Sequence, residues 1–93
     1  MKAVVCERPR QMGVEERPLP VRRAGEVLVK VRRIGLCGTD YHIFEGDQPF
    51  LSYPRVMGHE LAGEIEEADP ESGLATGTLV TINPYLACGR CIA

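Results

Sequence analysis

Apolar and polar positions alternate most clearly between residues 26 and 36, where Val27, Val29 and Val31 occupy every second position. A period of two indicates a β-strand with one buried face. A shorter β-branched run predicts another strand over residues 2–7 at the start of the chain. The pattern therefore indicates a chain built mainly from short strands.

Three further segments extend this picture. Residues 13–17 can pair with the first strand, and residues 78–82 form another β-branched run. Residues 56–67 are predicted to form one strand, in which Gly58 and Gly63 mark bulges or points of close backbone approach.

A single short helix is predicted over residues 39–45. Thr39 and Asp40 can cap its start, and Gly46 ends it. Residues 48–55 contain two prolines and are expected to form an extended loop. We therefore expect a mostly β fold, in the form of a partly open barrel of short strands with one short helix, because barrel closure removes exposed sheet edges.

Composition narrows the class of protein. A chain of 93 residues suits one small domain. Its net charge of -2 and its scattered basic residues argue against a nucleic-acid partner. The sequence has no apolar run long enough to span a membrane and no signal-peptide pattern at its start, so we expect a cytoplasmic protein without membrane contact. No glycine-rich dinucleotide fingerprint is visible.

The chemistry is concentrated around Cys37, which follows the strongest strand and precedes the helix. Helix N-termini favour a thiolate, the form of cysteine that binds zinc. His59 and Glu60 follow 22 and 23 positions later and add an imidazole and a carboxylate. Cysteine, histidine and one more protein ligand, with the fourth position open, form a catalytic rather than a structural zinc site.

Ordinary structural roles for these residues remain open at this point. Cys37 can be a buried small apolar residue, and His59 can be a hydrogen-bonded structural histidine. His59 and Glu60 would point to opposite faces of a regular strand, so both can reach one metal only where the backbone is irregular. Gly58 offers that irregularity.

The combination of motifs is more specific than any single ligand. Gly-Leu-Cys-Gly-Thr-Asp-Tyr-His at residues 35–42, Gly-His-Glu-Leu-Ala-Gly at residues 58–63 and Asn-Pro ahead of Cys-Gly-Arg-Cys at residues 83–91 occur in this order. Together they resemble the zinc-dependent medium-chain alcohol dehydrogenases over residues 1–93. The resemblance implies a GroES-like catalytic domain.

The resemblance also implies roles. Cys37 and His59 match the catalytic zinc ligands, and Glu60 matches a carboxylate that is a ligand in some branches of the family. Thr39 matches the hydroxyl that takes the substrate's proton, and His42 the histidine that passes it to solvent. In addition, Asp40 matches the carboxylate that holds the zinc-binding histidine.

Two details refine the resemblance. Gly38 is similar to the polyol, sugar-acid and threonine dehydrogenase branch, which implies a small polyhydroxylated alcohol as substrate. Cys88 and Cys91 match the first two of four cysteines in the family's structural zinc lobe, so residues 1–93 are expected to be truncated inside that lobe. Cys6 matches no ligand, and we expect it to pack in its strand.

The implied reaction is oxidation of a secondary alcohol, with zinc as the Lewis acid and hydride transfer to NAD or NADP. A separate Rossmann domain would hold the cofactor; it is absent from this sequence, so the fragment alone should be inactive. The full-length enzyme is expected to form a homo-oligomer. The aromatics Tyr41 and Phe44 and the loop at residues 48–53 can line the substrate pocket or simply pack.

Two other hypotheses remain. The chain can be a non-catalytic, co-chaperonin-like β-barrel assembly module, although such a module needs none of the zinc-site residues. Alternatively, it can be a small zinc protein that uses Cys88 and Cys91, for which the sequence supplies too few ligands.

Overall fold

The structure is a computed structural model that describes residues 1–86 and 89–90. Strands dominate it, and its one α-helix, α1 (Gly38–Glu45), has eight residues. The strands are β1 (Lys2–Arg8), β2 (Gln11–Glu16), β3 (Leu28–Gly35), β4 (Arg55–Val56), β5 (Glu60–Glu67) and β6 (Leu79–Thr81), and a 3-10 helix, η1 (Pro70–Ser72), joins the last two strands. The prediction of a mostly β fold with one short helix is confirmed.

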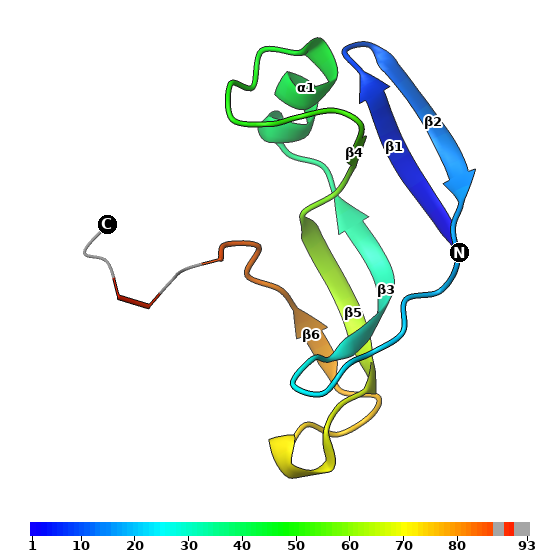
Figure 1. The fold of residues 1–93 in the computed structure, drawn as a ribbon, viewed down its shortest axis with the longest axis vertical. Coiled ribbons are helices and arrows are strands. Elements are labelled where there is room, and N and C mark those ends of the chain that lie inside the picture. Colours follow the sequence, from blue (N-terminus) through cyan, green and yellow to red (C-terminus); the bar gives the residue numbers. More distant parts are fainter. Residues whose placement is uncertain (87–88, 91–93) are drawn as a thin grey trace.

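The strands form two antiparallel sheets of three strands each, with the orders β2-β1-β4 and β3-β5-β6. Figure 1 shows the first sheet beside α1 and the second sheet extending away from it. The described residues form no closed barrel, which agrees with an open GroES-like arrangement. As predicted, the segment around residues 13–17 pairs with the first strand.

A small apolar core lies where α1 packs on β1. Ala3, Val5 and Cys6 of β1 and Ile43 of α1 are buried. Cys6 is fully buried in its strand, which confirms the expectation that it is a packing residue. Ile65 is the buried side chain of the second sheet. Helix α1, which Cys37 caps, is thus packed on the first sheet.

The prediction of one strand over residues 56–67 is wrong. The segment divides into β4 and β5, which belong to different sheets. The break falls at Gly58, whose φ of 98° lies in a region that side chains rarely adopt. The predicted close approach at Gly63 is confirmed, because a Cβ there would lie 2.7 Å from the carbonyl oxygen of Lys30.

The strand predicted at residues 26–36 forms as β3, but its expected half-buried alternation is not seen. Val31 is 46% exposed and Ile34 is 53% exposed. An irregularity in register between Val31 and Arg33 interrupts the period of two. In addition, among the elements that the structure describes, β3 makes extensive contacts with β5 alone, so its faces are largely open. None of the helices in the part of the chain that the structure describes has the length and apolarity that a membrane crossing requires.

Candidate metal centre

Cys37 is the N-cap of α1, with extended backbone dihedrals. The sequence placed the helix start at Thr39 and offered Thr39 and Asp40 as caps; instead, α1 begins one residue earlier. Asp40 occupies the third helical position and accepts a hydrogen bond from the backbone N–H of Cys37 at 3.0 Å. This contact satisfies a backbone donor that the helix itself leaves free. The side chain of Cys37 therefore lies at the helix N-terminus.

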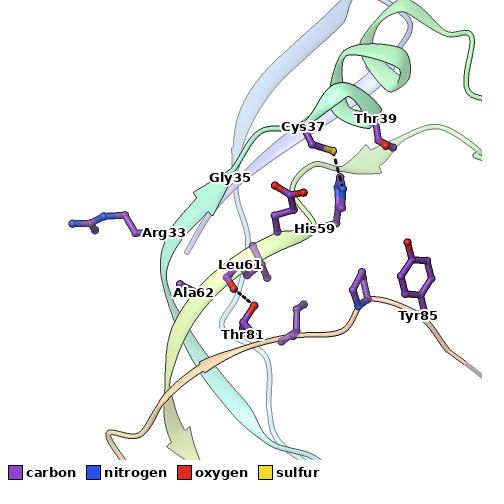
Figure 2. A pocket seen from close by; sticks show the side chains of 12 residues that line it. Arg33, Gly35, Cys37, Thr39, His59, Leu61, Ala62, Thr81 and Tyr85 are labelled. Atoms are coloured by element: carbon purple, nitrogen blue, oxygen red, sulfur yellow. Dashed lines mark hydrogen bonds between the residues drawn. The ribbon is translucent and has the colours of Figure 1, made fainter.

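His59 reaches the same point from the segment between β4 and β5. The turn at Gly58 places it just before the first residue of β5, outside regular strand geometry. Its Nε2 atom lies 3.2 Å from the Sγ atom of Cys37. Figure 2 shows the thiol directed at the imidazole ring, with Thr39 on the helix beside them. The irregularity expected at Gly58 thus brings two potential metal ligands together.

Asp40 completes this group. It is 5% exposed, and its Oδ1 atom lies 3.5 Å from Nδ1 of His59. Among the described residues this buried oxygen has no hydrogen-bond partner. One ligand atom each from Cys37, Asp40 and His59 lies within 4.8 Å of the other two. One oxygen of Asp40 therefore accepts a hydrogen bond from the backbone N–H of Cys37, and the other faces the imidazole ring of His59.

This arrangement fits a zinc ion held by Cys37 and His59. Zn–S and Zn–N bonds of about 2.3 and 2.0 Å at a tetrahedral angle place sulfur and nitrogen about 3.5 Å apart, close to the observed spacing. Binding through Nε2 leaves the ring proton of His59 on Nδ1, where it can be donated to the unpartnered oxygen of Asp40. A cysteine sulfur and a histidine nitrogen are common zinc ligands, and the buried carboxylate can hold the histidine ring in place.

A pocket of about 560 Å³ opens beside this group. Thr39 and Glu60 line it together with Cys37 and His59. Thr81 and Tyr85, which the sequence reasoning did not assign to the site, form part of the opposite wall (Figure 2). No local sequence motif marks these two residues, because only the pairing of β6 with β5 brings this distant segment to the site.

A second hollow of about 330 Å³ shares Thr39 and His59 with the first. Gln48 and Leu51 line it, so part of the loop expected at the substrate pocket does lie there. The aromatics named for this role do not line either hollow. Tyr41, for example, is 65% exposed.

Glu60 is the first residue of β5 and pairs with Gly35. Its carboxylate lies over that glycine, where a Cβ would be 3.1 Å from Oε2. Glu60 lines the pocket but is not part of the close group of Cys37, Asp40 and His59. Its role as a third ligand stays a prediction, as do the roles of Thr39 and His42.

His42 lies apart from both hollows, on the exposed side of α1. Its Nδ1 atom lies 2.9 Å from Oδ1 of Asp47, a residue that the sequence reasoning overlooked. Cys88 and Cys91, the predicted start of a structural zinc lobe, fall outside the described residues.

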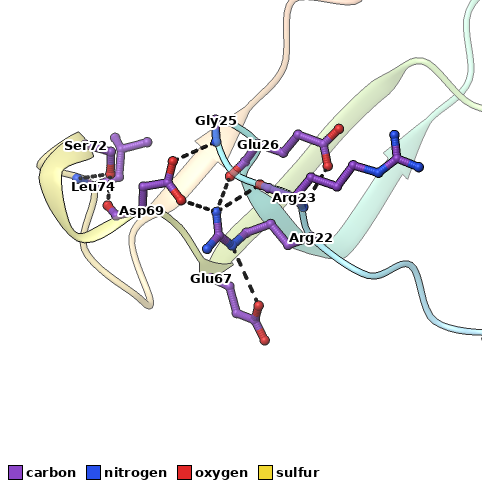
Figure 3. Close-up of polar contacts among 8 residues, drawn as sticks. All are labelled: Arg22, Arg23, Gly25, Glu26, Glu67, Asp69, Ser72 and Leu74. Carbon is purple, nitrogen blue, oxygen red and sulfur yellow. Dashed lines mark hydrogen bonds and ion pairs between the residues drawn. The ribbon is translucent and has the colours of Figure 1, made fainter.

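A separate polar cluster fixes the far end of the second sheet (Figure 3). Arg22 forms an ion pair with Asp69 and donates to the carbonyl oxygen of Glu26 at 3.1 Å. The backbone N–H of Gly25 donates to Asp69 at 2.7 Å. This hydrogen bond, followed by the contact with Arg22, lowers the pKa of Asp69. The cluster ties the loop before β3 to the end of β5.

Comparison with known proteins identifies the fold family. Residues 23–93 match the alcohol dehydrogenase GroES-like domain. The chain belongs to this family. The resemblance of its motifs to the zinc-type alcohol dehydrogenases is confirmed.

Two similar relatives have named activities. L-galactonate-5-dehydrogenase of Escherichia coli K12 is 40% identical over the whole chain, and L-threonine 3-dehydrogenase of Pyrococcus furiosus is 37% identical. The chain spans about 28% of the length of each of these proteins.

Solved structures agree. Galactitol-1-phosphate dehydrogenase of Escherichia coli has a TM-score of 0.86 at 32% identity, over 99% of this chain and 27% of that protein. An alcohol dehydrogenase of Escherichia coli CFT073, solved as a complex with NADH, has a TM-score of 0.84 at 42% identity, over 98% of this chain and 26% of that protein.

Proposed function

We propose that the chain is the N-terminal part of the catalytic domain of a zinc-dependent dehydrogenase that oxidises a secondary alcohol group with NAD or NADP. One observation gives this proposal its main support. Cys37, just after β3, and His59, just before β5, meet at 3.2 Å beside a buried carboxylate and at the edge of a pocket. An assembly module does not require this arrangement.

In this proposal Cys37 and His59 hold the zinc ion, and Glu60, at the rim of the same pocket, is the third protein ligand. When bound, zinc supplies Lewis-acid chemistry, which polarises an alcohol oxygen. Asp40 keeps the ring of His59 in the tautomer and orientation that present Nε2, because its free oxygen faces Nδ1 at 3.5 Å.

Thr39 and His42 move the proton. Thr39 lines the pocket within reach of a bound alcohol, and its hydroxyl can accept one hydrogen bond while it donates another. His42 follows three residues later, so both side chains lie on one face of α1. We assign Thr39 to receive the substrate's proton and His42 to deliver it to solvent.

The greater length of the relatives suggests which functions lie outside this chain. Because the relatives are more than three times as long as this chain, we propose that residues 1–93 form only the N-terminal part of the catalytic domain. A separate Rossmann domain would bind the nicotinamide cofactor, and the chain alone would not turn over substrate. Cys88 and Cys91 would supply two of the four ligands of a structural zinc site.

The relatives' names also suggest the substrate. L-galactonate and galactitol-1-phosphate dehydrogenases act on polyhydroxylated molecules, and we propose a small substrate of this class for the present enzyme. We further propose that the complete enzyme is a cytoplasmic homo-oligomer. The described cysteines Cys6 and Cys37 are free thiols, which suits a reducing compartment.

The test is the turnover of the complete dehydrogenase that carries this chain, measured as NADH or NADPH formation with a panel of polyols and sugar acids. Thr39→Val keeps the shape of the side chain and removes its hydroxyl. Loss of a group that transfers protons lowers kcat about 100-fold or more. Thr81→Val is the matched control, because this hydroxyl lines the same pocket but donates to the carbonyl oxygen of Leu61 at 2.7 Å.

We expect Thr81→Val to change kcat by no more than a few-fold, in line with the loss of one surface hydrogen bond. If Thr39→Val were as active as Thr81→Val, the proton role of Thr39 would have to be abandoned. If no alcohol reduced either cofactor in the complete protein, the dehydrogenase proposal itself would fail.

A further inference from the structure

His42 stands outside both hollows, yet it is held by a specific partner. Its Nδ1 atom and Oδ1 of Asp47 are 2.9 Å apart. Both side chains are more than half exposed, at 63% and 61%. An exposed pair of this kind contributes little to folding stability. The property that it can affect is the orientation of the imidazole ring.

The end of α1 builds this contact. Gly46 adopts a left-handed conformation with φ of 87° and ends the helix. The backbone N–H groups of Gly46 and Asp47 both donate to the carbonyl oxygen of His42, at 2.9 and 3.1 Å. The backbone of Asp47 is therefore tied to the same residue that its side chain contacts. Because the backbone of Asp47 is already held in place, its carboxylate loses less conformational entropy when it contacts the imidazole ring.

The contact decides which nitrogen carries the proton. An ionised carboxylate only accepts hydrogen bonds, so neutral His42 donates from Nδ1–H and keeps a lone pair on Nε2. Glu45, the other carboxylate at this helix end, is occupied by an ion pair with Arg10. Asp47 is thus the carboxylate that sets the state of the ring.

We propose that Asp47 is a positioning residue that fixes the tautomer and orientation of His42 for proton transfer. The inference rests on the proposed function. Nε2 accepts the proton that leaves the site, the resulting imidazolium stays paired with Asp47, and Nε2 then releases the same proton to solvent. The ring returns to its starting tautomer, so one proton passes for each turnover and no other bond changes.

The direct test is NMR of the 93-residue chain with ¹⁵N-labelled histidine at a pH where His42 is neutral. Long-range ¹H–¹⁵N spectra distinguish a protonated Nδ1 from a protonated Nε2. We expect His42 to show protonated Nδ1 in the wild type and in Glu45→Ala. In Asp47→Ala the signal should move towards the Nε2–H tautomer, and Asp47→Glu should restore it in part. The control variant removes one carboxylate from the same helix end without touching His42.

Turnover of the complete enzyme gives the second readout. Because an exposed ion pair is weak, Asp47→Ala should lower kcat by no more than about five-fold, with KM unchanged. Glu45→Ala should leave both constants unchanged. An unaltered His42 tautomer in Asp47→Ala overturns the inference, whatever the activity. By contrast, if no alcohol reduced either cofactor in the complete protein, the proposed function would fail and the NMR result would stand.

Discussion

Gly58 is the residue on which the geometry of the site depends most. Its φ of 98° turns the chain from β4 into the segment that carries His59. A Cβ at this position would lie 2.7 Å from Cγ2 of Ile34, closer than carbon atoms normally approach. Gly58→Ala therefore combines backbone strain with a steric clash.

The two costs can be estimated separately. A side chain in this backbone region costs about 1–3 kcal/mol. Overpacking against Ile34 adds about 1–3 kcal/mol, reduced if the half-exposed isoleucine moves aside. We expect the free energy of unfolding to fall by about 2–5 kcal/mol, and zinc affinity to fall as well, because relief of either cost shifts His59.

Two other glycines serve as controls. Gly73 also has a positive φ, of 73°, but a Cβ there would meet nothing within 4 Å. Gly73→Ala should therefore show the backbone cost alone. Gly13 has neither feature, so Gly13→Ala should be neutral or slightly stabilising.

The assay is urea unfolding of the chain followed by circular dichroism, with zinc affinity measured by competition with a chelator. The expected order of destabilisation is Gly58→Ala, then Gly73→Ala, then Gly13→Ala. Equal stability and equal zinc affinity of the Gly58 and Gly13 variants would refute the claim that this turn positions His59.

Two further predictions concern stability. Ile65→Ala, at a side chain that is 2% exposed, should lower the free energy of unfolding by about 2–5 kcal/mol in the same urea assay, whereas Leu79→Ala, at a side chain that is 77% exposed, should change it little. The pKa of Asp69 is lowered in the folded state, so its contribution is present above its ordinary pKa of 3.8 and is lost as the pH falls through the folded value. Asp69→Asn should therefore lower the urea midpoint clearly at about pH 6, and the difference from wild type should shrink towards about pH 2. A difference that is the same at both pH values would contradict this.

The sequence predicted the elements whose pattern is local. The run at residues 2–7 and the stop signal at Gly46 act over a few neighbours, and the structure forms both as expected. The metal-site residues were recognisable because their order and spacing form a specific motif, although spacing alone left ordinary packing roles open.

Other features depend on contacts that no local pattern contains. Residues 56–67 look like one apolar strand, and only the backbone at Gly58 shows that two sheets share them. Val31 is exposed because little packs on the faces of β3, which the composition of the strand does not indicate. Asp47 escaped notice because its contact with His42 requires the backbone reversal at the end of α1. Each error arose where tertiary structure overrides local preference.

The most direct test that Cys37 and His59 hold a zinc ion is the zinc content of the chain after dialysis, measured in a Cys88→Ser, Cys91→Ser background that removes the second thiol pair. One zinc ion per chain is expected there. Cys37→Ala should abolish it, whereas Cys6→Ala, which removes a fully buried thiol outside the site, should retain it. Unchanged zinc content in Cys37→Ala would show that Cys37 does not hold the metal.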